Sequence, residues 1–326
     1  HFLRTVLNIS KINFEYTIIL IIKDIKTILN DFIYNLNKYA KIIFIYNYIK
    51  CSDYINIFKP NIILLSTFNS EEEIKKLNIP NYLKNSIFYI HHGIASPYLN
   101  LNHLEKWSRK INYIYFDNLI DKCLKKIIEK KKLFQINGLP QFDHLIKNKK
   151  KIIDNKYKIY SKYKIDKKSI TIFIIYNSGY NDSLQKILDF FESYFSKINI
   201  NCFFLIKKKV DIVNINYNKK NNIKEIESNQ FIYDYLACDY NVIFGYSTSF
   251  VEALIISSKV ILFDDKNKIN YLKHFKSFKI CKDIKKINSI NLKEKITNKD
   301  KIYFQIKILG GKINYCTDNI LNILKN

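Results

Sequence analysis

One stretch of the sequence decides the fold: residues 237–254 read ACDYNVIFGYSTSFVEAL. An apolar run ends at Gly245, hydroxyl side chains follow, and a helical apolar pattern begins after them. This order is typical of a buried strand that turns sharply into a helix. Because the first backbone N–H groups of a helix have no intrahelical acceptor, Ser247, Thr248 and Ser249 form a candidate phosphate site.

Two interpretations stay open for Glu252, which lies in the first turn of the predicted helix. An acid at this position complements the helix dipole and could also hold a ribose or sugar hydroxyl. Alternatively, Ser249 caps the helix and Glu252, three residues on, completes a capping box.

Outward from this stretch, short β-branched runs alternate with amphipathic segments. Apolar residues at helical spacing predict helices over residues 24–39 and 182–196. The alternation of strands and helices predicts an α/β protein with parallel sheets. The predicted strands are 17–22, 41–46, 61–66, 86–91, 112–116, 133–137, 170–176, 202–206, 241–244 and 260–263.

The lysine- and tyrosine-rich segment 147–168 shows no strand pattern and marks the predicted domain boundary. We expect an N-terminal domain over residues 1–150 and a C-terminal domain over 151–326. The segment itself is typical of a solvated helix face, with a binding surface as the alternative. Because the chain starts at His1 and contains no Met, we expect the first domain to be truncated at its start.

Charge and composition narrow the class of protein. The 326 residues contain 54 Lys plus Arg against 29 Asp plus Glu, a net charge of +25, and 48% are hydrophobic. This apolar content excludes a disordered chain, and six scattered cysteines without a CxxC pair argue against zinc ribbons and disulfide scaffolds. No apolar run reaches the ~18 residues of a membrane span. Lys, Asn, Ile and Tyr are over-used throughout, which indicates a base-composition bias, yet the positive field still attracts anionic ligands.

Two further loops follow predicted strands of the first domain. Residues 90–97 read IHHGIASP, and a histidine on such a loop could accept a proton from a hydroxyl near neutral pH. A hydrogen-bonded core histidine is the alternative for one of the pair. Residues 135–143 read QINGLPQFD, where glycine and proline form a tight turn and Asp143 could cap the following helix.

In this order and at these spacings, the three loops resemble those of the two-domain GT-B transferases, and within them the CDP-glycerol glycerophosphotransferase family of teichoic acid biosynthesis. In that family a His-Gly loop closes a strand of the N-terminal domain, as His92-Gly93 does here. A Gly-x-Pro-Arg-x-Asp segment is matched by residues 138–143, and a donor-phosphate loop is matched by residues 237–252. The resemblance covers residues 60–265 and implies two Rossmann-like domains whose parallel sheets face across a cleft.

The resemblance also implies a transferase that moves a glycerophosphate or glycosyl group from a nucleotide-activated, CDP-glycerol-like donor to a hydroxyl of a cell-surface polymer or glycolipid. His92 would be the general base on the acceptor. The donor-binding residues would be Gly138, Asp143, Tyr246, Ser247, Thr248, Ser249 and Glu252, and the loop-shaping residues would be Gly93, Pro140 and Gly245. We expect no cofactor and no metal, because Asp264-Asp265 follows a strand without the spacer of a DxD pair. We expect a cytoplasmic enzyme that associates peripherally with the inner face of the membrane.

Three alternatives remain at this stage. The first is another GT-B glycosyltransferase or a nucleotide-sugar epimerase. The second is a catalytically inactive GT-B binding module, whose best support is that Gln141 and Gly245 stand where the family has Arg and Asp. The third is a nucleic-acid-binding protein; we expect no nucleic-acid partner, because the basic residues are dispersed and no RNP, zinc-finger or helix-turn-helix pattern occurs.

Overall fold

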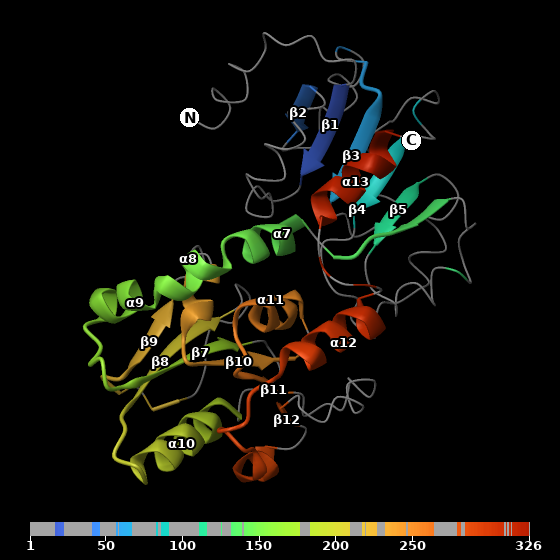
Figure 1. The fold of residues 1–326 in the computed structure, drawn as a ribbon. Coiled ribbons are helices and arrows are strands. Elements are labelled where there is room, and N and C mark those ends of the chain that lie inside the picture. Colours follow the sequence, from blue (N-terminus) through green and yellow to red (C-terminus); the bar gives the residue numbers. More distant parts are fainter. Residues whose placement is uncertain are drawn as a thin grey trace. The chain divides into compact units, whose positions relative to one another are not determined.

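The computed structural model divides the chain into two compact units, His1–His144 with Gln305–Asn326, and Leu145–Phe304 (Figure 1). The described residues are 17–22, 41–45, 57, 59–66, 83, 86–90, 111–115, 125, 132–138, 140–176, 183–208, 217–218, 220–226, 232–245, 247–263, 279–281, 284–309, 311, 313 and 315–325.

The first unit contains a six-stranded parallel sheet with the order β2-β1-β3-β4-β5-β6. Ile63, Leu64 and Ile114 are buried in it, as expected for strands that carry apolar residues on both faces. The helix α13 (Cys316–Lys325) also belongs to this unit. The strands are β1 (Thr17–Ile22), β2 (Lys41–Ile45), β3 (Ile62–Ser66), β4 (Ile87–Ile90), β5 (Asn112–Tyr115) and β6 (Leu133–Gln135). The helix predicted over 24–39 lies outside the described residues.

The second unit contains another six-stranded parallel sheet, with the order β12-β11-β10-β7-β8-β9. From β7 the chain proceeds outward to β8 and β9, and it then returns to the centre and proceeds outward the other way through β10, β11 and β12. This is the doubly wound order of a Rossmann-type sheet. The strands are β7 (Ile170–Tyr176), β8 (Cys202–Lys208), β9 (Ile223–Ile226), β10 (Tyr240–Phe244), β11 (Val260–Phe263) and β12 (Lys279–Cys281).

Helices cover both faces of the second sheet (Figure 1). On one face, Phe191 of α10 (Ser183–Ser196) packs against Tyr240, with ring centroids 5.5 Å apart, and η7 (Ile284–Ser289) lies beside it. On the other face, Tyr235 packs against Phe173 at 5.5 Å. The elements on that face are α8 (Lys149–Asp154), α9 (Lys156–Tyr163), η5 (Tyr233–Ala237) and α11 (Thr248–Ile256), with α12 (Asn298–Ile308) packed on α11 through Phe304 and Phe250. The sheet is therefore buried on both sides.

The division of the chain differs from the predicted one in two respects. The first unit ends at His144, inside α7 (Pro140–Lys147), instead of at residue 150, and the segment 305–326 belongs to the first unit instead of the second. The physical reason lies in α13, whose apolar residues Ile320 and Leu324 are buried. Its first N–H, from Cys316, donates to Asp143 Oδ1 at 3.0 Å.

Candidate functional site

The site lies at the centre of the second sheet, where β7 and β10 are neighbours. The chain leaves these two strands in opposite directions, so their carboxyl ends form the switch point at which open α/β sheets bind ligands. Tyr176 ends β7 and Phe244 ends β10. The residues that follow Phe244 are the glycine and the hydroxyl-rich stretch of the candidate phosphate site, Ser247, Thr248 and Ser249.

Gly245 makes the turn between β10 and α11. Its φ is 75°, in the region that favours glycine, and the residue is buried. Its N–H donates to the carbonyl of Phe263 at 2.8 Å, which extends the ladder to β11 by one residue. The chain therefore leaves the sheet at Gly245, and α11 begins three residues later, at Thr248.

The hydroxyl residues form the first turn of α11. Ser247 is the N-cap, with φ −153° and ψ 167° and no capping bond from its side chain. Thr248 and Ser249 are the first two helical residues, and all three are half-buried. Since the cap is Ser247 and not Ser249, the capping box with Glu252 is not formed. The N–H groups of this turn give the helix the polarity that favours an anion.

Glu252 lies one turn further along α11 and is only 5% exposed. Its Oε1 accepts a hydrogen bond of 3.3 Å from the hydroxyl of Tyr233, the first residue of η5. Burial raises the pKa of the Glu252 carboxyl to about 7, and the hydrogen bond from Tyr233 offsets part of that rise. This hydrogen bond links η5 to α11. The sequence pattern does not indicate it, because Tyr233 is 19 residues away from Glu252.

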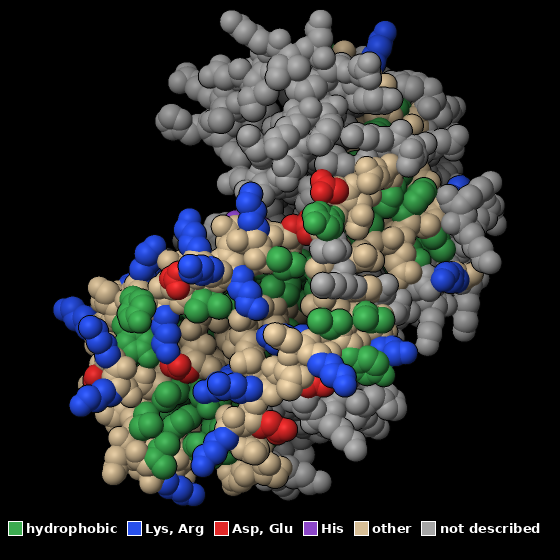
Figure 2. Space-filling view, in the orientation of Figure 1, with side chains coloured by type: hydrophobic (Ala, Val, Ile, Leu, Met, Phe, Trp, Pro, Cys, Tyr) green, Lys and Arg blue, Asp and Glu red, His purple; other side chains and the backbone are tan. Residues whose placement is uncertain are grey.

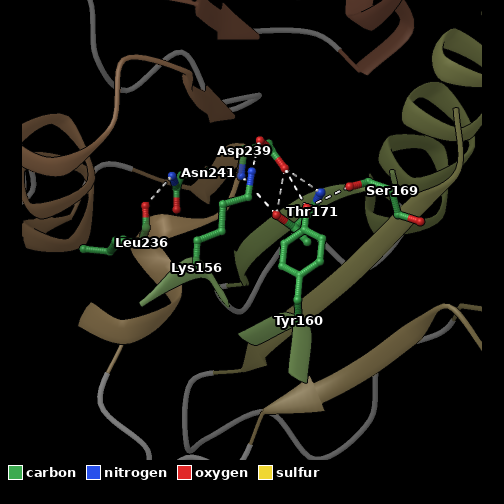
Figure 3. Close-up of polar contacts among 7 residues, drawn as sticks. All are labelled: Lys156, Tyr160, Ser169, Thr171, Leu236, Asp239 and Asn241. Atoms are coloured by element: carbon green, nitrogen blue, oxygen red, sulfur yellow. Dashed lines mark hydrogen bonds and ion pairs between the residues drawn. The ribbon is translucent and has the colours of Figure 1, made fainter. Parts of the chain in front are cut away.

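A second polar cluster fixes the opposite, amino ends of the same two strands (Figure 3). Asp239, just before β10, pairs with Lys156 of α9 at 2.5 Å and accepts hydrogen bonds from the N–H and the hydroxyl of Thr171 in β7, at 3.0 and 2.9 Å. Tyr160 adds a bond to the carbonyl of Ser169. Burial opposes ionisation of Asp239, but Lys156 and the Thr171 donors outweigh it, so the pKa of this carboxyl is lowered. The cluster connects α9, β7 and β10, and so it fixes the relative positions of the two strands whose carboxyl ends form the switch point.

The other predicted site residues belong to the first unit, except for Tyr246, which belongs to the second. His92, Gly93 and Tyr246 lie outside the described residues. Gly138 is buried with φ 136°, and a Cβ there would meet the ring of Phe142 at 2.8 Å, so its role in this unit is to allow a tight turn.

Pro140 opens α7 at the first helical position, which proline tolerates. Asp143 lies inside α7 and accepts the N–H of Cys316, so it holds the start of α13. It is therefore not the N-cap of α7 that the sequence predicted. Within the part of the chain that the structure describes, no group of three or more His, Cys, Asp or Glu is arranged to hold a metal.

Comparisons with known proteins find this architecture elsewhere. No family model and no curated protein matches the sequence. Among solved structures, a variant of the wall teichoic acid polymerase TagF is 12% identical, over 95% of this chain and 88% of that one, with a TM-score of 0.61. A UDP-GlcNAc 2-epimerase from Methanocaldococcus jannaschii is 13% identical, over 95% and 99%, with a TM-score of 0.58. A glycosyltransferase from Rickettsia africae ESF-5 is 12% identical, over 96% and 98%, with a TM-score of 0.56.

These likenesses establish the fold, which is the α/β, GT-B architecture predicted from the sequence. The structures also include TagF soaked with CDPG and the epimerase in complex with UDP-GlcNAc and UDP.

Proposed function

We propose that the protein is a GT-B transferase that takes a glycerophosphate or glycosyl group from a nucleotide-activated donor and passes it to a hydroxyl of a cell-surface polymer or glycolipid. The observation that carries the proposal is the start of α11 at the switch point of β7 and β10, reached through the buried Gly245 turn. The nucleotides bound by TagF and the epimerase are consistent with a nucleotide-activated donor.

In this proposal the donor phosphates lie against the first turn of α11, at Ser247, Thr248 and Ser249. The helix dipole and the N–H groups stabilise the charge that develops on the leaving phosphate. Glu252 is buried and already engaged by Tyr233, so we assign it to holding α11 and η5 in place, not to the direct contact with a donor hydroxyl that the sequence suggested.

His92 is the proposed general base on the acceptor hydroxyl. It follows β4, whose carboxyl end is at Ile90. Removal of the acceptor proton by a positioned base contributes about 10²- to 10⁴-fold to a rate. The acceptor, as part of a surface polymer or glycolipid, would place the protein at an anionic membrane surface, which suits its net charge of +25.

One experiment distinguishes the proposed transferase from two other functions of the same fold, an epimerase and an inactive binding module. Calorimetric titration with CDP-glycerol and with UDP-GlcNAc, followed by analysis of the products, identifies the donor and the reaction. Transfer to an added acceptor supports the proposal, whereas interconversion of UDP-GlcNAc without an acceptor indicates an epimerase. Absence of binding to either nucleotide would overturn the proposal and favour an inactive module. If transfer to the acceptor is observed, an unchanged turnover of His92→Ala would show that His92 is not the general base.

A further inference from the structure

An open pocket of about 560 Å³ lies in the second unit, at the amino ends of β7, β8 and β9. Ser169 precedes β7, Asn201 precedes β8 and Asn222 precedes β9, and all three line the pocket. Its volume is within the range of about 300–1,000 Å³ that is typical of small-molecule sites. We call it the amino-end pocket. The proposed donor site lies beyond the opposite end of β7, about 20 Å away along the strand.

Two side chains of the pocket are held in place by contacts within the protein. Asn222 Nδ2 donates to Glu192 Oε1 at 3.1 Å and to the carbonyl of Cys202 at 3.0 Å. Glu192 Oε2 is paired with Lys220 Nζ at 2.6 Å. The amide oxygen of Asn222 accepts no hydrogen bond from the described residues. The pocket therefore contains a fixed acceptor that is available to a ligand.

Ser169 adds a hydroxyl group to the pocket. The residue is only 8% exposed, and its carbonyl accepts a hydrogen bond of 2.8 Å from the hydroxyl of Tyr160. In Figure 3 the carbonyl of Ser169 points toward Tyr160, whereas its hydroxyl points away. Within the part of the chain that the structure describes, neither this hydroxyl nor the exposed side-chain amides of Asn201 and Asn221 have a hydrogen-bond partner. These groups can therefore bind a ligand without losing a contact in the protein.

The charges around the pocket are balanced. Glu192 and Asp166 line it together with Lys164, and the fourth charge is that of Lys220, the partner of Glu192. The surrounding surface is different, since the whole chain has a net charge of +25 and Figure 2 shows Lys and Arg side chains spread over the second unit with fewer acids among them. An anion is therefore attracted more strongly elsewhere, and the pocket favours an uncharged ligand.

We propose that the amino-end pocket binds a neutral polyhydroxylated ligand, a sugar or polyol unit. A ligand hydroxyl both donates and accepts, as the serine hydroxyl does, and the asparagine amides offer a donor and an acceptor each. Ile165, Ile200 and Phe203 supply an apolar lining for the C–H groups of such a ligand. A purely apolar ligand would leave the polar groups of the pocket without partners, which costs binding free energy.

The inference goes beyond the proposed function and does not rest on it, because the amino-end pocket shares no residue with the start of α11. Sugar binding is therefore measured both without nucleotide and with an excess of UDP. Nucleotide affinity is measured separately on the same variants and should not change. Failure of the donor site and failure of the amino-end pocket thus give different results.

The test is saturation-transfer NMR of the full chain, titrated singly with glucose, galactose, N-acetylglucosamine and glycerol. We expect at least one of these four compounds to bind, with or without UDP. Ser169→Ala, which removes one hydrogen-bonding group, should weaken that binding about 2- to 10-fold. Asn201→Ala/Asn221→Ala, which removes two amides at exposed positions, should weaken it about ten-fold or more.

Asn218→Ala/Asn298→Ala is the matched control, because it replaces two exposed asparagines outside the pocket. It should bind like the unchanged protein, and circular dichroism checks that every variant is folded. The proposal is overturned if none of the four compounds binds, if UDP displaces the bound compound, or if the pocket variants bind as tightly as the control. Binding of inorganic phosphate in place of the four compounds, weakened by Lys164→Gln, would identify an anion site and would also overturn it.

Discussion

Glu252 gives the sharpest quantitative prediction, because a buried acid makes stability depend on pH. Burial raises its pKa in the folded protein from the ordinary value of 4.5 to about 7. The folded state therefore holds the proton more tightly than the unfolded chain. Between these two values the unfolded chain ionises and the folded protein does not, so the free energy of unfolding falls as pH rises. The difference of 7 minus 4.5 corresponds to about 3 kcal/mol, at ~1.4 kcal/mol for each pKa unit.

The assay is urea unfolding of the unchanged protein and of Glu252→Gln at several pH values from acid to slightly alkaline. Glutamine keeps an acceptor for Tyr233 but does not ionise. Relative to this variant, the unchanged protein should lose about 3 kcal/mol as the pH rises from 4.5 to above 7. Glu294→Gln, at an exposed glutamate, is the control. If the stabilities of Glu252→Gln and the unchanged protein stay parallel across this range, the burial argument is wrong.

The remaining predictions concern residues that stabilise each of the two units. Asp239→Asn should lower the free energy of unfolding by about 1 to 3 kcal/mol at neutral pH, because it breaks the ion pair with Lys156. Since the pKa of Asp239 is lowered below the ordinary 3.8, this difference should disappear as the pH falls through that lowered pKa, and urea unfolding measures it. Gly138→Ala should cost about 2 kcal/mol or more, since φ is 136° and the added Cβ meets Phe142. Gly311→Ala should cost less, because its Cβ meets the movable Asn137 side chain, and equal losses in thermal unfolding would contradict this reasoning.

Much of the fold could be predicted from the sequence because the central strands are continuous apolar runs. β1, β7 and β11 have the predicted bounds. Edge strands carry a weaker signal: β9 reads IKEI, with its two middle side chains exposed, and it was not predicted. The helix α13 was missed as an element of the first unit because its anchor, Asp143, is 173 residues away from Cys316.

The site was predictable only where its signal is local. The strand, glycine and hydroxyl order of residues 240–249 indicated a helix start at a strand end, and α11 begins there. Which hydroxyl caps the helix depends on a backbone turn of one or two residues, so Ser247 and Ser249 could not be distinguished. The partner of Glu252 and the Asp239 cluster both depend on side chains brought together by the tertiary fold, which no spacing in the sequence encodes.

The start of α11 offers the most direct test of the account. Thr248 is the first helical residue, where proline fits: it would remove one backbone N–H, and Ser247 already has the extended backbone that precedes a proline. Thr248→Pro should bind CDP or UDP about ten- to hundred-fold more weakly than Thr248→Ala, which lacks the hydroxyl but keeps the N–H. Calorimetric titration of the two folded variants gives this ratio directly. Equal nucleotide affinity of the two variants would contradict a donor site at the start of α11.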